Sequence, residues 1–600
     1  MTEDSRTEGQ VGHHGGIAVA NGPEGDALDW PSIDWPKVED DVRRLRQRIF
    51  TASQAGDLKK VRSLQKLMLR SRANALSSVR RVTELNAGRQ TAGVDKVVVV
   101  TAPGKAALAD RLRHHDAAPT ARPVRRVYIE KANGKQRPLG IPVIFDRAHQ
   151  ALVKNALEPE WEARFEPKSY GFRPGRGCHD AIEAIFHVAR GPNPRRKWCL
   201  DADLAAAFDR IDHSELLDRL GTFPARKHVE QWLKAGVVEQ GRFAPTEEGT
   251  PQGGVISPVL LNIALHGMEQ AAGVRYQTTG VHAGEFRPDS PVLIRYADDL
   301  IALCHTKAQA EEVKARLAEW LVPKGLTFNE DKTSIVTLDD GFDFLGFGVR
   351  RQSGKLLIRP SKAAVKRHRQ RLRNEMRALR GHNAVAVLQR LTPIVRGWAT
   401  YYRTVVSSEQ FAALDRYLWM LTYKWAKQSH PKKSKHWIVD RYFGRFNKSR
   451  RDRWVFGDRN NGAYLVKHAW TKIVRHQMVR MGSSPDDPAL AEYWANRRRR
   501  ATPPPMDNLS LRLLRSQHGA CPLCEELLFV ADHPPQSPEE WAQWVRTTKK
   551  VLAKRHLTFE AHGTSDDSST LRLVHARCYQ RSTAAPGPQS LQRPRACRLA

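Results

Sequence analysis

The sequence predicts an α+β chain of several domains, with a small antiparallel sheet backed by helices and a helical region after it. Two short apolar runs, 292–294 and 300–303, flank the tight Tyr296-Ala-Asp-Asp299 turn, which predicts strand, turn and strand. Apolar residues at helical spacing from Val385 to Trp398 predict a helix in the later region. The length of 600 residues also favours several domains.

The acids of the tight turn require a cation, because adjacent carboxylates repel each other unless their charge is neutralised. Residues 199–209 predict a strand that ends in acids and turns into a helix, so Asp203 would add a third carboxylate. Three aspartates and substrate phosphates suit two hard divalent ions about 3.5–4 Å apart, an arrangement that catalyses phosphoryl transfer. The alternative for the turn alone is a solvated Asp-Asp hairpin.

A glycine-rich segment, Gly249 to Pro258, lies between the two acidic sites and contains Gln252. Its glycines allow the backbone to approach a nucleotide or a template strand closely. Ser257 as N-cap and Pro258 at the first helical position predict a helix that runs through Leu265.

The composition favours a polyanionic partner, because the net charge is +34 and the pI is near 10.2. A long nucleic acid is the first choice and an acidic membrane the second. No apolar run approaches the ~18 residues of a membrane span, and the acidic, glycine-rich first thirty residues do not resemble a signal peptide. Seven cysteines in so long a chain do not form a disulfide framework, which favours a reducing cytoplasm.

The basic charge is concentrated in residues 361–460, which hold 24 Lys or Arg against 6 Asp or Glu. The aromatic residues interleaved with this charge suit the core of a helical bundle. A surface that is only solvated does not need so large an excess of basic over acidic residues, so a phosphate-binding face is favoured. The next Arg-rich stretch, 471–508, fits a DNA-contacting linker, or else a flexible tether.

Many motifs occur in the order found in one family. After a helical block that closes at 91–95 come the motifs at 131–142, 169–177, 199–209, 249–258 and 296–299, then 325–333, 342–347 and 391–403. From about residue 30 to 470 the chain resembles a group II intron-encoded protein, a reverse transcriptase with maturase activity. The resemblance implies a right-hand polymerase with fingers, a palm and a helical thumb called domain X.

The resemblance also implies roles for individual residues. Asp203, Asp298 and Asp299 would be catalytic and hold two Mg²⁺ ions. Substrate binding would fall to Lys131, Arg137, Phe208, Gln252 and Tyr296, with Phe208 excluding a ribose 2′-hydroxyl. Contacts with primer, template and RNA would come from Lys332, Phe344, Leu345, Gly346, Arg396, Trp398, Tyr401, Tyr402 and Arg403. For Phe208 and Phe344 the alternative is core packing.

Two pairs in the tail, Cys521-x-x-Cys524 and His575-x-x-Cys578, have the spacing of one four-ligand Zn²⁺ site. The alternative is unlinked buried cysteines. The arrangement resembles an HNH endonuclease domain of ββα type, but only His562 of an expected double His is present. An expected Asn and a final His are also missing, the latter replaced by Tyr579. Because a nuclease needs such groups to activate water, we expect a retained zinc fold with weak or absent cleavage.

The expected function is RNA-directed DNA synthesis together with assistance to splicing of a group II intron. Its partners would be the intron RNA, an RNA template, a DNA primer, target DNA and dNTPs, in a bacterial cytoplasm and on the nucleoid, with no membrane. The alternatives are an intron-free reverse transcriptase with a defence or other domesticated role, and a maturase that only folds RNA. The domains we expect are a disordered leader (1–30), a helical N-terminal extension (31–110), fingers and palm (111–350), thumb (351–470), basic linker (471–508), HNH-like zinc domain (509–582) and a disordered tail (583–600).

Overall fold

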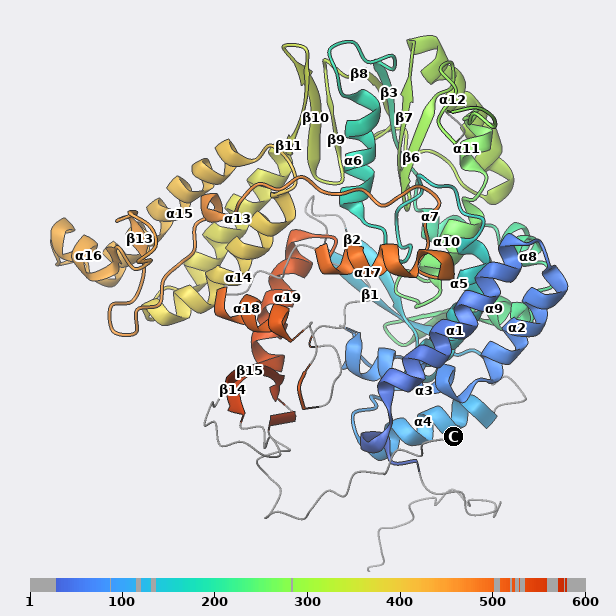
Figure 1. Ribbon diagram of the computed structural model, residues 1–600, viewed down its shortest axis with the longest axis horizontal. Helices are drawn as coiled ribbons and strands as arrows, with labels where there is room; N and C mark the ends of the chain where they lie inside the picture. The colour runs from blue at the N-terminus through green and yellow to red at the C-terminus, as the bar shows by residue number, and fades with distance from the viewer. Residues whose placement is uncertain are drawn as a thin grey trace, which may run out of the picture.

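The computed structural model describes residues 28–86, 88–114, 120–130, 136–281, 284–500, 508–517, 521–523, 528, 535–557, 570–576 and 578–579. Most of the expected leader and all of the expected tail therefore lie outside the described residues. So do three predicted site residues, Lys131, Cys524 and His562. Figure 1 shows the chain as an open arrangement, with the N-terminal helices and the thumb helices on opposite sides of a central sheet region.

The N-terminal helices pack around one long buried helix, α5. Polar residues start the first three of them: Asp34, Asp57 and Ser71 each accept a hydrogen bond from a backbone N–H of the first turn, as N-caps do. The elements are η1 (Trp30–Ser32), α1 (Trp35–Gln54), α2 (Leu58–Arg70), α3 (Arg72–Arg80), a π-helical turn (Arg81–Leu85), α4 (Ala102–His114) and α5 (Ile144–Glu162).

A four-stranded sheet forms the fingers. Its order is β2-β1-β4-β5, with β1 antiparallel to β2 and parallel to β4. The strands are β1 (Val124–Glu130), β2 (Gln136–Ile141), β4 (Val237–Glu239) and β5 (Arg242–Ala244).

The central sheet has the order β6-β7-β3-β8 and all its pairs are antiparallel. Its strands are β3 (Trp198–Asp203), β6 (Val292–Tyr296), β7 (Asp299–Cys304) and β8 (Ser334–Thr337). Leu200 and Leu300 share a buried cluster with Leu317 of α12, whereas Cys199 and Ile301 share a second cluster with Ile182 of α6. Alternate residues of each strand therefore face different helices, so the sheet is covered on both faces (Figure 1).

The helices around this sheet are α6 (Cys178–Ala189), α7 (Ala207–Arg210), α8 (His213–Leu220), α9 (Arg226–Leu233), α10 (Ser257–Ala264), α11 (Met268–Ala271), α12 (Lys307–Leu321) and η3 (Val322–Lys324). The predicted N-cap role of Ser257 is wrong. Helix α10 already begins at Ser257, and the Ser257 hydroxyl donates to the Pro251 carbonyl over 3.0 Å instead of accepting from the helix.

The thumb follows a three-stranded sheet, β9 (Phe342–Phe344), β10 (Phe347–Gln352) and β11 (Lys355–Pro360). Its elements are α13 (Lys362–Ala378), α14 (Ala384–Tyr402), α15 (Ser408–Ser429), α16 (Lys435–Tyr442), β12 (Phe443–Gly444) and β13 (Val455–Phe456). The prediction of a helix from Val385 to Trp398 is confirmed, because these residues lie within α14. The expected aromatic core is confirmed too, since Trp398, Tyr417 and Trp425 are all buried.

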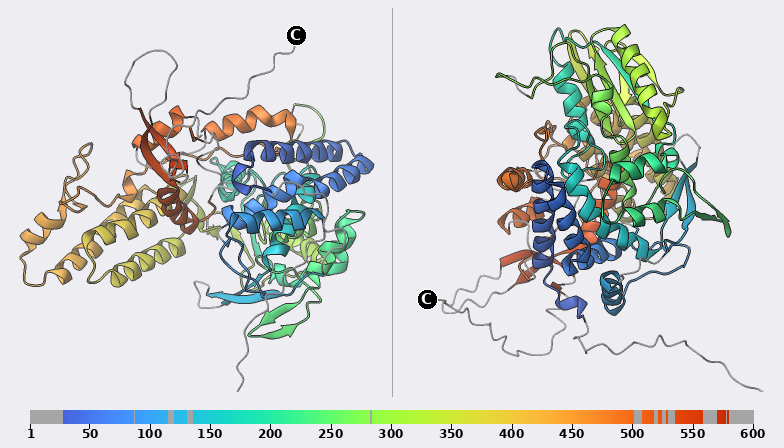
Figure 2. Two further views of the ribbon diagram at one scale, coloured as in Figure 1. Left: turned by 90° about the horizontal axis from the view of Figure 1, so that it is seen from below. Right: turned by 90° about the vertical axis from the view of Figure 1, so that its right-hand side faces the viewer.

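The described part of the stretch 471–508 contacts the palm and the N-terminal helices. His476 and the Val479 N–H both bind Asp180 of α6 over 2.8 Å, and Asp486 pairs with Arg46 of α1 over 2.7 Å. These contacts favour a packed segment over a flexible tether. Figure 2 shows the helix that follows these residues, α17 (Ala491–Arg500, orange), beside the blue N-terminal helices.

The chain ends in a smaller region with a paired hairpin. Its elements, with those that lead into it, are η4 (His468–Trp470), η5 (Pro488–Leu490), α17 (Ala491–Arg500), α18 (Asn508–Ser516), α19 (Pro538–Val551), β14 (Leu552–Leu557) and β15 (Thr570–His575). Strands β14 and β15 are antiparallel. Helices precede both strands, and the predicted HNH-like zinc fold stays a prediction.

Candidate active site

Three carboxylates converge at one end of the central sheet. Asp203 ends β3 and lies directly opposite Asp299, the first residue of β7. Tyr296 pairs with Asp299, so Ala297 and Asp298 form a two-residue turn between β6 and β7. Ala297 has a φ of 58°, the left-handed conformation that tight hairpin turns of this length require. The predicted strand, turn and strand are therefore confirmed, and the three acids are brought together.

A buried polar network holds this turn from below. Arg295 donates to the Asn262 side chain over 3.0 Å and to the Ala297 carbonyl over 3.2 Å, and Asn262 donates to the Gly171 carbonyl over 2.9 Å. A Cβ atom at Gly171 would lie 2.3 Å from the Ala297 nitrogen, so only glycine fits against the turn. The network fixes where Asp298 and Asp299 stand.

The electrostatics of the cluster favour a bound cation. Burial raises the pKa of Asp299 to about 8, and the charges of Asp298 and Asp203 add to the rise. Burial also raises the pKa of Asp298, which Arg137 and Lys332 partly oppose. Three like charges in a poorly solvated site do not readily ionise together. A multivalent cation bound to these oxygens would offset the repulsion, so that all three carboxylates could be ionised.

Lys332 supplies a positive charge at the cluster. Its ammonium group contacts a carboxylate oxygen of Asp203, and this hydrogen bond raises the pKa of Lys332. The loop that carries it is tied to β3, since the Asn329 N–H donates to the Asp203 carbonyl over 2.8 Å. The all-oxygen donor set of the three carboxylates suits Mg²⁺, which prefers carboxylate ligands, and the Lys332 ammonium group lies on Asp203 where part of that charge would be neutralised.

The described residues that were predicted to bind substrate differ in their exposure and contacts. Arg137 lies on β2 and is exposed, and its charge acts on Asp298. The Gln252 carbonyl accepts from the Gly140 N–H over 2.7 Å, which ties the glycine-rich segment to the fingers. Phe208 is half-buried, and its ring centre lies 6.1 Å from that of Phe172 in an edge-to-face pair. Phe208 is thus neither fully exposed nor sealed in the core.

Phe344 to Gly346, which were predicted to contact primer or template and are called the predicted primer grip below, lie at a second tight turn, between β9 and β10. Leu345 and Gly346 both have positive φ, 50° and 82°. The Tyr401 hydroxyl donates to the Leu345 carbonyl over 3.3 Å, and the Tyr402 hydroxyl donates to the Gly346 carbonyl over 3.1 Å. The thumb therefore holds the turn directly.

Several residues predicted to contact nucleic acid have buried side chains. Phe344, Trp398, Tyr401 and Tyr402 are each 2–3% exposed. Their packing gives them a positioning role behind the turn, and any contact with nucleic acid stays a prediction. Arg396 and Arg403 are half-buried on α14 and at its end.

The tail brings three of the four predicted zinc ligands together. Ligand atoms of Cys521, His575 and Cys578 all lie within 4.8 Å of one another, and Cys524 lies outside the described residues. The side-chain amide of Gln517 makes two hydrogen bonds of 2.8 Å with the backbone of Leu573 on β15, one as donor and one as acceptor. The donor set of two thiols and an imidazole suits a tetrahedral Zn²⁺.

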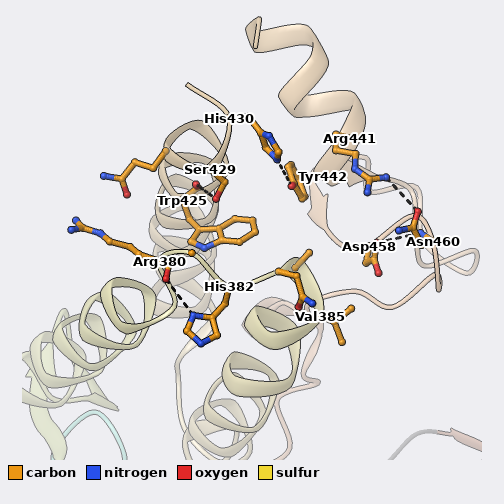
Figure 3. A pocket seen from close by; sticks show the side chains of 14 residues that line it. Arg380, His382, Val385, Trp425, Ser429, His430, Arg441, Tyr442, Asp458 and Asn460 are labelled. Carbon is orange, nitrogen blue, oxygen red and sulfur yellow. Dashed lines mark hydrogen bonds between the residues drawn. The ribbon is translucent and has the colours of Figure 1, made fainter. Parts of the chain in front are cut away.

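A cavity of about 870 Å³ lies at the distal end of the thumb, between the α13–α14 turn, the end of α15, and α16. Figure 3 shows Arg380, His382 and Arg441 around it, with Trp425 at its floor. His430 and Tyr442 close one side through a hydrogen bond of 2.7 Å between the imidazole and the hydroxyl. This part of the thumb thus presents basic groups around a hollow.

Comparisons with known families decide what this arrangement belongs to. Residues 129–349 match the family described as Reverse transcriptase (RNA-dependent DNA polymerase), and residues 30–112 match the N-terminal domain of reverse transcriptase. Residues 365–443 match the Group II intron, maturase-specific domain. The chain belongs to the group II intron-encoded reverse transcriptases.

Individual relatives agree with this. Protein YkfC of Escherichia coli is 35% identical over 311 residues, which cover 47% of this chain and 81% of that protein. The Group II intron-encoded protein LtrA of Lactococcus lactis is 40% identical over 153 residues, 25% of each chain. An uncharacterized 91 kDa protein in the cob intron of Schizosaccharomyces pombe is 27% identical over 48% of this chain and 44% of its own.

The reverse transcriptase and maturase-specific domains make RNA and other nucleic acids the partners of this intron-encoded protein. The residues that hold the Ala297-Asp298 turn, Arg295, Asn262 and Gly171, were not predicted as site residues. All three are buried, and although Arg295 directly precedes the turn and Gly171 lies within the motif at 169–177, their contacts with one another join distant segments and are visible only in the fold. No helix in the described ranges combines the length and apolarity that crossing a membrane requires.

Proposed function

We propose that this protein synthesises DNA on an RNA template at the site formed by Asp203, Asp298 and Asp299. The convergence of the three carboxylates on the paired strand ends is the observation that carries the proposal. The three would hold two Mg²⁺ ions, which when bound lower the pKa of the primer hydroxyl and neutralise the leaving pyrophosphate.

The surrounding residues give the substrates their positions. Arg137 would bind the triphosphate through its planar, permanently charged guanidinium group. Phe208 would lie beneath the sugar, and Gln252 would contact the incoming nucleotide from the segment tied to β2. Leu345 and Gly346 would support the primer on a turn that Tyr401 and Tyr402 keep in place.

The same protein would assist the splicing of its intron RNA. The thumb matches the maturase-specific domain, and residues 361–460 carry 24 basic against 6 acidic side chains. The distal cavity, with Arg380, His382 and Arg441 at its rim, would receive a phosphate or an unstacked base. Binding the folded RNA more tightly than its unfolded forms would favour the folded state by mass action.

The test is primer extension on an RNA template by the full-length protein with Mg²⁺. Asp298→Asn should lower the dNTP incorporation rate by ~10²-fold or more, because it removes charge where the transition state needs it. RNA affinity should persist, since it depends on the thumb.

Asp339→Asn is the matched control, because Asp339 is exposed just after β8, at the end of the central sheet opposite the carboxylate cluster. It should retain the extension rate within about threefold, as expected of sites outside the reacting centre. An Asp298→Asn protein that extends primers as fast as the wild type would refute the proposed site.

A further inference from the structure

The cleft between the palm and the thumb contains an acidic stretch of the chain's own C-terminal region. A cavity of about 360 Å³ is walled by Tyr296, by the Leu345-Gly346 turn, by α13 and α14, and by residues 536–539. The stretch 535–546, hereafter the cleft segment, thus lies beside both the catalytic hairpin and the predicted primer grip. Figure 1 shows α19, which contains most of it, alongside α14.

The cleft segment is fitted to the palm at its first residues. The Cys178 N–H, at the start of α6, donates to the Gln536 side-chain oxygen over 2.7 Å, and the Cys178 thiol donates to the Gln536 carbonyl over 3.6 Å. A Cβ atom at Gly177 would lie 2.6 Å from that same side-chain oxygen. The Gln536 side chain therefore lies directly against the backbone at the start of α6.

The cleft segment is fitted to the thumb by a second glycine. A Cβ atom at Gly397 of α14 would lie 2.6 Å from the Ala542 nitrogen and 2.8 Å from the Pro538 carbonyl oxygen. Ala542 and Val545 are fully or almost fully buried. The segment therefore bridges thumb and palm, and its contact with α14 is a backbone contact that a larger side chain at residue 397 would prevent.

The charge of the cleft segment opposes that of its surroundings. Glu539 pairs with Arg371 of α13 over 3.2 Å, and Arg367 lines the same cavity. Glu540 acts on the Tyr296 hydroxyl, whose pKa is raised by burial, then by Cys178 and by the charge of Glu540. Carboxylates here neutralise the arginines that a phosphate backbone would otherwise meet, and they repel phosphates themselves.

We infer that the cleft segment and a primer–template duplex exclude each other from this cleft, so that the docked segment holds the polymerase in a closed, autoinhibited state. The inference rests on the proposed polymerase function. The alternative, in which the segment is an added part of the duplex-binding surface, conflicts with two glutamates in the path of a polyanion. A duplex would displace α19 from α14, because both states compete for Arg371 and for the same space beside Leu345 and Gly346.

Hydrogen–deuterium exchange of the full-length protein distinguishes these states. Adding an RNA–DNA primer–template should increase exchange in residues 538–546, because displacement exposes the amides that α14 now covers. Increased protection of those residues on binding, or unchanged exchange with the duplex bound, would overturn the inference while leaving the polymerase proposal intact. Absence of duplex binding by fluorescence anisotropy, both in the wild type and in the variants below that weaken docking of the segment, would refute both.

Two variants test the same point by affinity. Glu539→Gln with Glu540→Gln should tighten the primer–template Kd by ~5-fold, in line with the ~1 kcal/mol upper range of an exposed ion pair. Glu311→Gln with Glu312→Gln makes the same change of charge on α12, over the other face of the palm sheet, and should leave Kd within twofold. Equal tightening in both double variants would mean a bulk charge effect and would overturn the inference.

Gly397→Ala tests displacement without any change of charge. Alanine has a higher helix propensity than glycine and so favours α14 itself, whereas its methyl group would clash with the Ala542 backbone. Kd should again tighten several-fold. Weaker binding by this variant and by the Glu539/Glu540 double variant would show that the docked segment helps to hold the duplex, which contradicts the inference.

Discussion

Asp203 and Asp299 are register partners on neighbouring antiparallel strands, so their carboxylates face the same side of the sheet at the same height. A slip of one residue between β3 and β7 would turn one of them to the opposite face. The register is secured along the whole of β3, which pairs with β7 from Trp198 to Asp203 and with β8 on its other edge. The geometry of the carboxylate cluster is therefore a direct product of sheet pairing.

Phe208→Ala should raise the use of ribonucleotides relative to deoxyribonucleotides. Phe208 follows β3 on the short helix α7, and its ring is half-buried against Phe172. Removing the ring opens room for the ribose 2′-hydroxyl without creating a new contact. A change of this kind alters the preference for dNTP over rNTP by about 10–200-fold. Single-nucleotide extension with rNTP and dNTP gives the ratio, and an unchanged ratio would assign Phe208 to core packing alone.

Asn262→Ala should lower kcat while leaving the KM for dNTP within about twofold. The change removes the partner of buried Arg295 and of the Gly171 carbonyl, so the Asp298 turn loses its support. Leaving such groups without partners costs ~2–4 kcal/mol of unfolding free energy. The measurements are steady-state extension kinetics and denaturant unfolding.

Asn74→Ala is the matched control for this prediction. Asn74 is equally buried and bridges the Met68 and Leu152 carbonyls, but among the N-terminal helices. It should lose a similar ~2–4 kcal/mol of stability while keeping kcat. If both variants lose stability and both keep kcat, Asn262 only stabilises the fold and does not position the turn.

The sequence predicted the elements whose signals are local. The hairpin around Asp298, the acidic end of β3 and the helical spacing in α14 each lie within fewer than twenty residues, and each was confirmed. Packing between distant segments left no such signal. Nothing in the sequence pairs Gly397 with Ala542, or Gly171 with Ala297, because a glycine selected for close approach looks like any other glycine. The N-cap prediction for Ser257 was wrong for a related reason, since its hydroxyl donates to the Pro251 carbonyl across the loop.

Glu269→Gln should increase stability near neutral pH. Burial raises the pKa of Glu269 to about 7, although the Tyr276 hydroxyl, which donates over 2.7 Å, lowers it in part. Between pH 4.5 and 7 the folded chain therefore holds a proton that the unfolded chain has released, so stability falls as the pH rises. The rise of the pKa from 4.5 to about 7 corresponds to roughly 3 kcal/mol.

The measurement is the free energy of unfolding of both proteins from pH 4.5 to 7.5. The difference between wild type and Glu269→Gln isolates Glu269 from other groups with raised pKa values, such as Asp201. Glu312→Gln, an exposed change elsewhere, should leave the pH profile of the wild type unaltered. A difference that does not vary with pH would show that Glu269 titrates normally.

The full-length protein should bind one Zn²⁺ per chain. Cys521, His575 and Cys578 already present their ligand atoms within 4.8 Å, and sequence spacing adds Cys524 as the fourth ligand. Metal analysis should give about one zinc per chain for the wild type, as one four-ligand site requires. His575→Ala should lose it, whereas Cys304→Ala, at a buried thiol of β7, should retain it.

The same tail should not nick target DNA. A single-metal nuclease needs a base to activate water and further ligands for its ion, but the sequence retains only His562 of the expected double His and has Tyr579 in place of the final His. A zinc-loaded protein–intron complex should therefore leave the opposite strand of its target intact, and the primer would come from another source, such as a nascent strand at a replication fork. Opposite-strand nicking that disappears in His562→Ala would show that the remaining residues suffice for cleavage.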